Sequence, residues 1–386
     1  MNIGFDAKRA YHNTTGLGYY SRTIIGLLSR YYPEHQYFLF NPKSSDRFKF
    51  KADNLHEILP SGIINAVFSS AWRSSWVKKD LLKNGIDLYH GLSHEIPMGI
   101  KNTGVRSVVT IHDLIHERYP EQYNNIDVKI YHKKFLYACQ HADRIIAISG
   151  QTKKDIIEFY GIDPEKIDIC YQSCDPAFGQ TVSEEEKLRI CQKYSLPKKF
   201  FLYVGSVIER KNLLNICKAM FLLRNDLDIP LVVIGDGGKY KQIVKDYVLQ
   251  HGLTNRIIFL SEDPNIKSDP ELRTAQAFAA IYQSAIAMIY PSYFEGFGAP
   301  VLEALWSRLP VITSNRSCLP EVGGEGAYYV DPDQALEIAT AMRIVYADET
   351  LRKGLIQKGW AHAQLSAPSI YVKNMMNIYL KTIDPH

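Results

Sequence analysis

The sequence predicts an α/β protein with two doubly wound parallel sheets, and three observations carry this prediction. The chain has 386 residues, more than the roughly 250–300 at which a single hydrophobic core usually stops growing. Short apolar runs alternate with longer stretches of helical periodicity, as in parallel sheets with helices on both faces. Two such series follow each other along the chain, so we expect one sheet in each of two domains.

The apolar runs give the expected strands in order. Those of the first series lie at 2–7, 36–41, 86–91, 106–113 and 144–149. Those of the second series lie at 200–206, 230–237, 256–261, 286–292 and 309–314. Ligands of open α/β sheets bind beyond the carboxyl ends of the strands, so the residues that follow each run are the first candidates for a site.

The boundary between the two domains is expected after residue 172 and before residue 199. This stretch loses the strand pattern and contains Pro176, Gly179 and Pro197, residue types that favour turns and linkers. We assign residues 1–175 to a first domain on the acceptor side, 176–366 to a second domain that binds the nucleotide sugar, and 367–386 to a terminal helix that could pack back on the first.

Composition narrows the class of protein. Lys and Arg number 45 against 41 Asp and Glu, a net charge of +4, which is too small to indicate a nucleic-acid partner. The six cysteines are scattered, as expected for reduced thiols. The chain begins without a signal-peptide pattern and lacks an apolar run long enough for a membrane span. We therefore expect a cytoplasmic protein, with peripheral contact to the inner face of the cell membrane as an option.

The stretch PSYFEGFGAPVLEA, residues 291–304, has the pattern of an anion-binding turn. It follows an apolar run, its two glycines permit a tight turn, and its second proline suits the first turn of a helix. The backbone amides around Phe297, Gly298 and Ala299 would then lie at a helix N-terminus, where phosphate binds favourably. The stretch therefore predicts a seat for a diphosphate.

Two glutamates flank this seat. Glu295 precedes the turn, and Glu303 is expected about one turn inside the helix. Taken singly, Glu295 could be a solvated loop residue and Glu303 a favourable charge near the helix N-terminus. Together they suit the vicinal hydroxyls on either side of a sugar diphosphate, because ionised carboxylates only accept hydrogen bonds.

The segment EGFGAPVLEALWSRLPVI, residues 295–312, resembles the signature of the retaining GT-B glycosyltransferases of family 4, also described as glycosyl transferases group 1. The resemblance extends over nearly the whole chain and implies a GT-B architecture, in which two Rossmann-like domains face a cleft. It implies that Glu295 contacts the donor sugar and Glu303 the nucleotide ribose. The chain departs from the family at Arg308, where glycine is usual.

A cationic pair, Arg210 and Lys211, opens an expected helix after the first strand of the second series. The guanidinium of Arg can donate two parallel hydrogen bonds to phosphate oxygens, and the ammonium of Lys is a compact positive charge, so both suit a diphosphate. The resemblance implies that this pair binds the donor pyrophosphate, with further donor contacts at Gly205, Ser206 and Gly235. Family members often have Arg or Thr where Ser206 stands, so a phosphate contact there would be weaker.

A glycine-containing turn also precedes the first long helix of the first domain. A dinucleotide fingerprint would need a third glycine where Ser21 stands, and the next strand lacks a terminal acidic residue, so a nicotinamide cofactor is not expected. The resemblance implies that Gly16, Leu17 and Gly18 face the donor phosphate and the acceptor. It also implies that His112, at the end of a strand beside a carboxylate, contacts the donor sugar.

Contacts to the acceptor are expected from Tyr19, His94 and Asp113. His90, His94 and Glu95 follow one strand and could suggest a metal site, but their spacing matches no compact ligand motif. The resemblance also implies that no catalytic metal is needed. We therefore expect neither a metal nor a cofactor.

Residues 63–83 combine apolar side chains at helical spacing with four basic residues and one aspartate. A helix that covers the sheet is the favoured interpretation, and binding to an anionic lipid surface is the alternative. Many members of the family glycosylate lipid-linked acceptors, which supports the alternative.

These observations predict a retaining glycosyltransferase that moves a hexose from a nucleotide diphosphate sugar to a saccharide or a lipid-linked saccharide. The segment at 110–120, TIHDLIHERYP, is similar to bacterial mannosyltransferases and related enzymes of surface polysaccharide assembly, which favours GDP-mannose over a UDP-sugar. The long segment at 261–276, where the base is normally held, leaves the base open. The alternatives are an epimerase or phosphorylase of the same architecture, or a sugar-binding module without chemistry.

Overall fold

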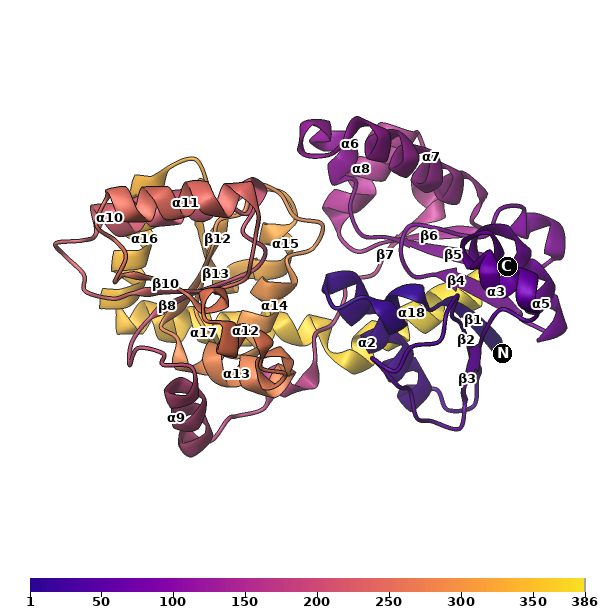
Figure 1. The fold of residues 1–386 in the computed structure, drawn as a ribbon, viewed down its shortest axis with the longest axis horizontal. Helices are drawn as coiled ribbons and strands as arrows, with labels where there is room; N and C mark the ends of the chain where they lie inside the picture. The colour runs from indigo at the N-terminus through magenta and orange to yellow at the C-terminus, as the bar shows by residue number, and fades with distance from the viewer. Residues whose placement is uncertain (385–386) are drawn as a thin grey trace. The chain divides into compact units, whose positions relative to one another are not determined.

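The computed structural model describes residues 1–384, and the chain divides into two compact units. Unit 1 consists of Met1–Ser173 together with the chain from Ala367 onward, and unit 2 consists of Cys174–Ser366. Each unit contains its own parallel sheet with helices on both faces (Figure 1). The predicted α/β class with two doubly wound parallel sheets is confirmed.

Within residues 1–384, unit 1 has a seven-stranded sheet in the order β3-β2-β1-β4-β5-β6-β7. All neighbouring strands are parallel, and Ile3 of β1 lies opposite both Tyr37 and Leu88. The central strands are buried on both faces, which explains their continuous apolar sequences. The strands are β1 Asn2–Asp6, β2 Gln36–Phe40, β3 Leu55–Ile58, β4 Leu88–Gly91, β5 Arg106–Ile111, β6 Arg144–Ala147 and β7 Ile167–Ile169.

The helices of unit 1 lie on both faces of this sheet. Figure 1 shows α6, α7 and α8 on one side and α2 and α18 on the other. The side chains of Asn124 and Ser149 accept hydrogen bonds from the backbone amides of Ile126 and Thr152, in the first turns of α7 and α8, as N-cap residues do. The α-helices of unit 1 outside the segment 63–83 are α1 Lys8–His12, α2 Gly16–Tyr31, α6 Ile115–Arg118, α7 Asn125–His141, α8 Gly150–Tyr160 and α18 Pro368–Ile383.

The C-terminal helix α18 belongs to unit 1, although unit 2 separates it from the rest of that unit in sequence. It packs against α2 and β5 (Figure 1), and it buries Tyr371, Met375 and Tyr379. The hydroxyl of Tyr379 lies 2.7 Å from Nδ1 of His90. The core of unit 1 is therefore completed by residues from the end of the chain.

Unit 2, which is described throughout, has a six-stranded parallel sheet in the order β10-β9-β8-β11-β12-β13. Leu202 of β8 lies opposite Val232 of β9 and Met288 of β11. The strand order reverses between β8 and β11, which is where open α/β sheets bind ligands. The strands are β8 Phe201–Val204, β9 Leu231–Ile234, β10 Ile257–Phe259, β11 Ala287–Tyr290, β12 Val311–Ser314 and β13 Ala327–Val330.

The helices of unit 2 also cover both faces of their sheet. Figure 1 shows α10 and α11 on one face and α13 and α17 on the other. They are α9 Glu184–Lys193, α10 Leu213–Leu222, α11 Lys239–Gln250, α12 Pro264–Ser268, α13 Ala275–Ser284, α14 Ala299–Trp306, α15 Leu319–Gly323, α16 Ala335–Ala347 and α17 Glu349–Ala363.

The basic and apolar segment at 63–83 differs from the single helix that its spacing predicts. It forms α3 Ile63–Val67, α4 Ser69–Ala71, a π-helical turn at Trp72–Trp76 and α5 Lys78–Lys83. This interrupted helix buries the indole of Trp72, whose Nε1 donates to Asp80 at 2.6 Å. The residues of α3 remain exposed or half-buried. None of the helices within residues 1–384 combines the length and the apolar character that a membrane span requires.

Candidate functional site

The loop between β11 and α14 carries a buried carboxylate, Glu295, which is 7% exposed. Its Oε1 accepts hydrogen bonds from Lys211 Nζ and Tyr290 Oη, each at 2.9 Å, and from Ser292 Oγ at 2.8 Å. Its Oε2 lies 3.1 Å from Nη1 of Arg210. The structure thus brings three sequence-predicted residues, Arg210, Lys211 and Glu295, into one ion-paired cluster.

The electrostatics of this cluster keep Glu295 ionised. Burial opposes ionisation, but the attraction of Lys211 and Arg210 outweighs it and lowers the pKa of Glu295 to about 2. Burial lowers the pKa of Lys211, and the positive charge of Arg210 adds to this effect against the attraction of Glu295. A buried pair of cations with one carboxylate between them retains an excess of positive charge, which is the complement of a phosphate group.

The cationic pair lies ahead of its helix, not inside it as its sequence position suggests. Arg210 and Lys211 belong to a 3₁₀ turn at Glu209–Lys211, and α10 begins only at Leu213. Asn212 separates them in a left-handed conformation with φ of 61°. Its side-chain amide donates to the carbonyl oxygens of Pro291 and Pro332 at 3.1 and 2.7 Å, which ties the turn to the Glu295 loop.

The loop reaches α14 through Gly298, the helix N-cap, at φ of 90°. A Cβ atom there would also lie 2.8 Å from Leu319, so glycine is required by both conformation and space. The backbone amides of Gly298 and Ala299 donate no hydrogen bond to any residue within 1–384. Free amides at the N-terminus of an eight-residue helix form an anion-binding arrangement.

Glu303 lies within α14, as predicted, and is held separately from the Glu295 cluster. Its Oε2 accepts a hydrogen bond from the hydroxyl of Tyr282 at 2.9 Å. Burial raises its pKa to about 7, with the Tyr282 hydrogen bond opposing and the charge of Asp175 adding to the shift. The two glutamates therefore differ in charge state near neutral pH.

Gly205 and Gly235 end neighbouring strands β8 and β9 and touch each other. A Cβ atom on Gly235 would lie 1.8 Å from the carbonyl oxygen of Gly205, so only glycine permits this approach. Ser206 follows in an exposed position. Asp236, next to Gly235, pairs with Lys267 of the long 261–276 segment at 2.6 Å, which holds that segment at the same edge of the sheet.

Arg308 stands where the resembling family usually has glycine, and the structure shows why glycine is usual. Its backbone has φ of 54°, a left-handed conformation that costs a residue with a side chain about 1–2 kcal/mol. The guanidinium carbon lies 3.8 Å from the ring centroid of Trp360. This cation–π contact offsets part of the backbone cost.

In unit 1, His112 follows β5 and is buried. Its Nε2 lies 2.9 Å from the carbonyl oxygen of Leu92; because a carbonyl oxygen only accepts, Nε2 carries the proton. Burial lowers the pKa of His112 to about 4, and the positive charge of Arg9 adds to the effect against the Leu92 hydrogen bond. The ring is therefore neutral at pH 7, with Nδ1 as an acceptor for a hydroxyl.

The other histidines of this region serve the interior of unit 1. His90 is fully buried, and both ring nitrogens are hydrogen-bonded, to Tyr379 and Thr110. His94 is 8% exposed and stacks on Phe135 with ring centroids 4.1 Å apart. Burial is the main cause that lowers its pKa, followed by the electrostatic effects of His112, His116 and Arg9.

The remaining candidates of unit 1 lie at the start of α2 and after β5. Gly16 begins α2 in an exposed position, Leu17 is half-buried and Gly18 is buried. Tyr19 is exposed, and the guanidinium of Arg22 lies over its ring. Asp113 is half-buried, and its Oδ1 accepts the backbone amide of Ile115 at 3.1 Å.

Sequence reasoning missed the groups that hold the two glutamates. Tyr290 and Ser292 donate to Glu295, and Tyr282 donates to Glu303. Tyr290 and Ser292 end the apolar run and could have been found as hydroxyls within five residues of the carboxylate. Tyr282 lies 21 residues before Glu303 and carries no local signal. Residues 1–384 contain no group of three or more His, Cys, Asp or Glu side chains that could hold a metal ion.

Comparison with protein families adds a second line of evidence. The family model described as glycosyl transferases group 1 matches residues 184–361, and the model described as glycosyltransferase family 4 matches residues 16–178. O-antigen chain mannosyltransferase B of Escherichia coli is 25% identical over 381 residues, which cover 94% of this chain and 95% of that protein. O-antigen chain mannosyltransferase RfbU of Salmonella typhimurium is 27% identical over 65% of this chain and 62% of its own length.

Solved structures with the same fold match over the full chain. A sucrose-phosphate synthase from Thermosynechococcus elongatus matches with a TM-score of 0.76 at 17% identity, covering 100% of both chains. A glycosyltransferase from Rickettsia africae matches with a TM-score of 0.74 at 16% identity, covering 100% of this chain and 99% of that one. Anabaena Alr3699/HepE, solved in complex with UDP-glucose, has a TM-score of 0.70 at 14% identity over 99% and 100% of the two chains.

Proposed function

Because the chain belongs to the group 1, family 4 glycosyltransferases and has their GT-B fold, we propose that it transfers a hexose from a nucleotide diphosphate sugar to a saccharide acceptor, with retention of configuration. The observation that carries this proposal is the buried cluster of Arg210, Lys211 and Glu295 next to the free amides of Gly298 and Ala299. Cations, amides and a carboxylate together match the phosphates and hydroxyls of such a donor.

The leaving group is a nucleoside diphosphate, on which negative charge develops as the sugar departs. Arg210 and Lys211 stabilise this charge, with the amides at the start of α14 as additional donors. A preorganised pair of cations supplies the stabilisation that a divalent metal would otherwise give. The proposed reaction is therefore independent of a metal.

Glu295 orients the donor sugar in this proposal. Both of its oxygens are occupied by strong donors in the free protein, and a carboxylate stabilised in this way is a weak nucleophile. This favours front-face attack, with the leaving phosphate accepting the proton of the acceptor hydroxyl, over a covalent glycosyl intermediate on Glu295. A trapped glycosyl adduct on Glu295 would overturn the orienting role.

The donor sugar and the ribose meet different groups. His112, neutral with Nδ1 available, accepts a hydroxyl of the sugar, and Glu303 accepts the ribose hydroxyls. Gly16, Leu17, Gly18, Gly205, Ser206, Gly235 and Phe297 line the donor, and Tyr19, His94 and Asp113 lie on the acceptor side. The O-antigen mannosyltransferases among the relatives favour GDP-mannose as donor and surface polysaccharide assembly as the setting.

A donor panel tests the proposal. The purified chain is incubated with UDP- and GDP-sugars and candidate acceptors; products are identified by mass spectrometry and their anomeric configuration by NMR. One donor should give a retained glycoside, and Lys211→Ala should lower kcat/KM at least about 100-fold, as expected for loss of a leaving-group contact. Lys218→Ala, in α10 and outside the cluster, is the matched control. Full activity of Lys211→Ala would contradict the site assignment.

The same panel separates the alternatives. An epimerase would change the donor sugar without an acceptor, and a phosphorylase would show the absorbance of a pyridoxal cofactor. A sugar-binding module would release no nucleoside diphosphate. Each outcome differs from the formation of a glycoside.

We further propose peripheral contact of unit 1 with an anionic membrane through residues 63–83. Ile63 and Phe68 are 85% and 57% exposed, and Lys78 and Lys79 follow in the same segment. Apolar side chains beside lysines suit an anionic interface. The chain should bind to vesicles that contain phosphatidylglycerol, and this binding should be lost when Lys78 and Lys79 are changed to Glu. The control changes Lys129 and Lys154, elsewhere in unit 1, to Glu. Equal binding of both variants would contradict this contact.

A further inference from the structure

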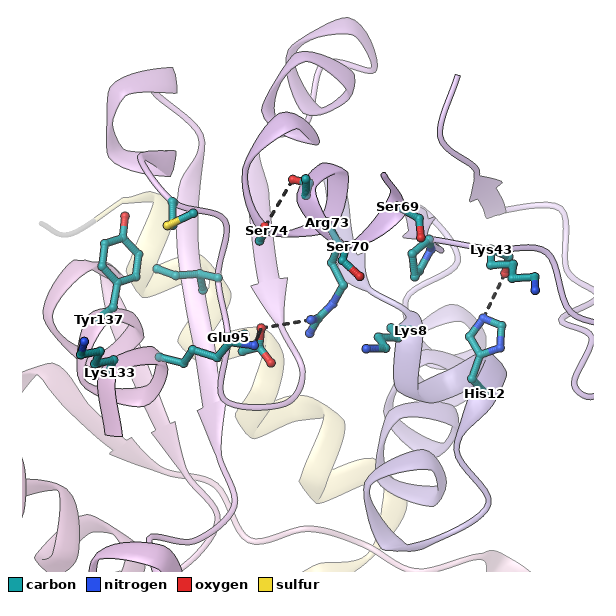
Figure 2. A pocket seen from close by; sticks show the side chains of 15 residues that line it. Lys8, His12, Lys43, Ser69, Ser70, Arg73, Ser74, Glu95, Lys133 and Tyr137 are labelled. Carbon is teal, nitrogen blue, oxygen red and sulfur yellow. Dashed lines mark hydrogen bonds and ion pairs between the residues drawn. The ribbon is translucent and has the colours of Figure 1, made fainter. Parts of the chain in front are cut away.

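Unit 1 contains a cavity of about 780 Å³ at the carboxyl edge of its sheet. The cavity is formed by α1 after β1, by the chain that follows β2, by the serines before the π-helical turn, by the chain after β4 and by α7. Figure 2 shows Lys133 and Tyr137 on one side, Lys8 and His12 on the other, and Arg73 and Glu95 between them. Its volume is that of an ordinary small-molecule site.

The lining is strongly basic. Five cationic side chains and a single carboxylate, that of Glu95, face the cavity. The cations are Lys8, Lys43, Arg73, Lys133 and Lys134. Most protein surfaces intersperse the two signs of charge, so an excess of this size inside one cavity indicates an anionic ligand.

Two of these cations are already used within unit 1. The Nε of Arg73 donates to both oxygens of the buried Asp6 at 3.0 Å, and its Nη1 donates to Glu95 at 3.0 Å. Lys134 lies 3.3 Å from the same oxygen of Glu95. The single carboxylate of the lining is therefore shared between two cations.

The other three cations have no such partner. Within residues 1–384, the ammonium groups of Lys8, Lys43 and Lys133 have no carboxylate within 4.0 Å. Burial, followed by repulsion from Arg73 and Arg9, lowers the pKa of Lys8. An anion in the cavity would relieve that repulsion and give the three ammonium groups a common partner.

We propose that this cavity binds the phosphate or diphosphate group of the acceptor, so that the acceptor is a phosphorylated saccharide. The inference rests on the proposed glycosyl transfer and names the class of its acceptor. A neutral saccharide would need hydroxyl-binding carboxylates and amides, and would leave three ammonium groups unpaired. A phosphate offers oxygens to several lysines at once.

The neighbouring surface bears on the source of the phosphate. Ser69 and Ser70 of the lining directly follow the exposed apolar turn that contains Ile64, Val67 and Phe68. Met98, which lines the cavity itself, is 52% exposed. Apolar groups beside a phosphate site suit a lipid diphosphate, whereas a free sugar phosphate would make no use of them.

Calorimetric titration tests the inference with two probes, inorganic pyrophosphate and farnesyl diphosphate. The full chain carries Lys211→Ala throughout, so that the anion site of unit 2 is weakened. Adding Lys8→Gln and Lys133→Gln should raise the Kd of both probes at least tenfold. The matched control, Lys129→Gln with Lys154→Gln, removes two exposed lysines of unit 1 that do not line the cavity and should leave both Kd values unchanged.

Each outcome decides a separate point. Unchanged affinity for both probes in the Lys8 and Lys133 variant would overturn the inference, and Lys43→Gln provides an independent check if that variant folds poorly. If farnesyl diphosphate binds at least tenfold more tightly than pyrophosphate, the acceptor is assigned as lipid-linked. If the two probes bind with equal affinity, the acceptor is assigned as a free sugar phosphate. If probe binding depends on Lys8 and Lys133 but the chain has no transferase activity, the proposed function is contradicted and the anion site in this cavity stands.

Discussion

Glu295 pairs with two buried cations in the free protein, and this placement gives it two roles at once. A diphosphate that binds Arg210 and Lys211 must compete with the carboxylate for both of them. As the diphosphate takes over the cations, the Glu295 oxygens become available to the hydroxyls of the sugar. Donor binding therefore exchanges one set of charged hydrogen bonds for another, with little net cost in desolvation.

This exchange makes a prediction for Glu295→Gln. The amide keeps the shape and accepts hydrogen bonds from Ser292 and Tyr290, but it leaves Arg210 and Lys211 without a counter-charge. The free protein should lose about 3 kcal/mol of unfolding free energy, in the range found when a buried pair loses one partner. The nucleoside diphosphate should bind about tenfold more tightly, because its competitor for the cations is gone, while kcat falls.

Denaturant unfolding, calorimetric titration and initial rates measure the three effects. Glu325→Gln, an exposed glutamate of unit 2 that pairs with Lys358, is the control. Weaker binding of the nucleoside diphosphate to Glu295→Gln would show that Glu295 does not compete for the cations.

Glu303 predicts a pH dependence of donor binding. Its pKa of about 7 means that the carboxyl is mostly protonated at pH 6 and mostly ionised at pH 8. Only the ionised form accepts hydrogen bonds from both ribose hydroxyls, so the affinity for the nucleotide sugar should rise about tenfold over this range. The pyrophosphate of a nucleotide sugar does not titrate there, which isolates the protein group.

Titrations of the nucleotide sugar at several pH values check this effect. Glu303→Gln should bind weakly and without the pH dependence. A slope that survives in Glu303→Gln would assign the titration to another group.

The residue types of the site were predictable, but their pairing was not. The spacing of Glu295, the glycines and Glu303 carries a local signal, as do two adjacent cations after a strand. The contact of Glu295 with Arg210 and Lys211 instead depends on how a 3₁₀ turn packs against a loop 84 residues away in sequence. The amide of Tyr293, which donates to the carbonyl oxygen of Arg210 at 2.9 Å, fixes that packing and has no local signature.

At the scale of elements, the ten expected strands are all present and the three that were missed are β3, β7 and β13. All three lie at an edge of their sheet, where one side of the strand has no neighbour. Their side chains are mostly half-buried or exposed, so they lack the continuous apolar sequence of a central strand. Periodicity therefore detects the interior of a parallel sheet better than its edges.

The segment 63–83 shows a different limit of periodicity. Its apolar residues recur at helical spacing, yet Trp72 and Phe68 point into different environments, one buried and the other exposed. The indole of Trp72 reaches Asp80, and the π-helical turn that begins there shifts the register of the following residues. A side chain with a distant polar partner can thus override the spacing that surrounds it.

The turn into α14 makes a prediction for Gly298→Ala. The added Cβ meets a left-handed backbone and Leu319 at 2.8 Å, so we expect a loss of about 1–3 kcal/mol in unfolding free energy. Donor affinity should fall as well, because the free amides move with the turn. Denaturant unfolding and titration of the nucleotide sugar measure the two effects.

Gly354→Ala is the matched control. Gly354 lies inside α17 with no atom within 4 Å of an added Cβ, so the change should stabilise the protein by about 0.5–1 kcal/mol. Equal effects of the two substitutions would show that the conformation of Gly298 is not required.

At the scale of the whole molecule, α18 predicts unequal consequences of truncation. A chain that ends at Ser366 loses the buried Tyr371, Met375 and Tyr379 and leaves His90 without its Nδ1 partner. Unit 1 should melt at least about 10 °C lower, since each buried aromatic contributes several kcal/mol. Unit 2 contains none of these contacts and should keep its melting temperature.

Differential scanning calorimetry of the two chains measures these transitions. A chain that ends at Ile383 retains α18 and serves as the control. Equal losses in both units would show that α18 stabilises more than the unit it belongs to.

The return of α18 to unit 1 also fixes the order in which the protein can be completed during synthesis. A ribosome finishes every residue of unit 2 before it makes α18, so unit 2 can fold while unit 1 still lacks the helix that covers α2 and β5. Newly made unit 1 must therefore wait, with part of its apolar core open, until α18 has been made. Chaperones that hold nascent chains should engage the first 173 residues for longer than those of unit 2, and release should follow the synthesis of α18.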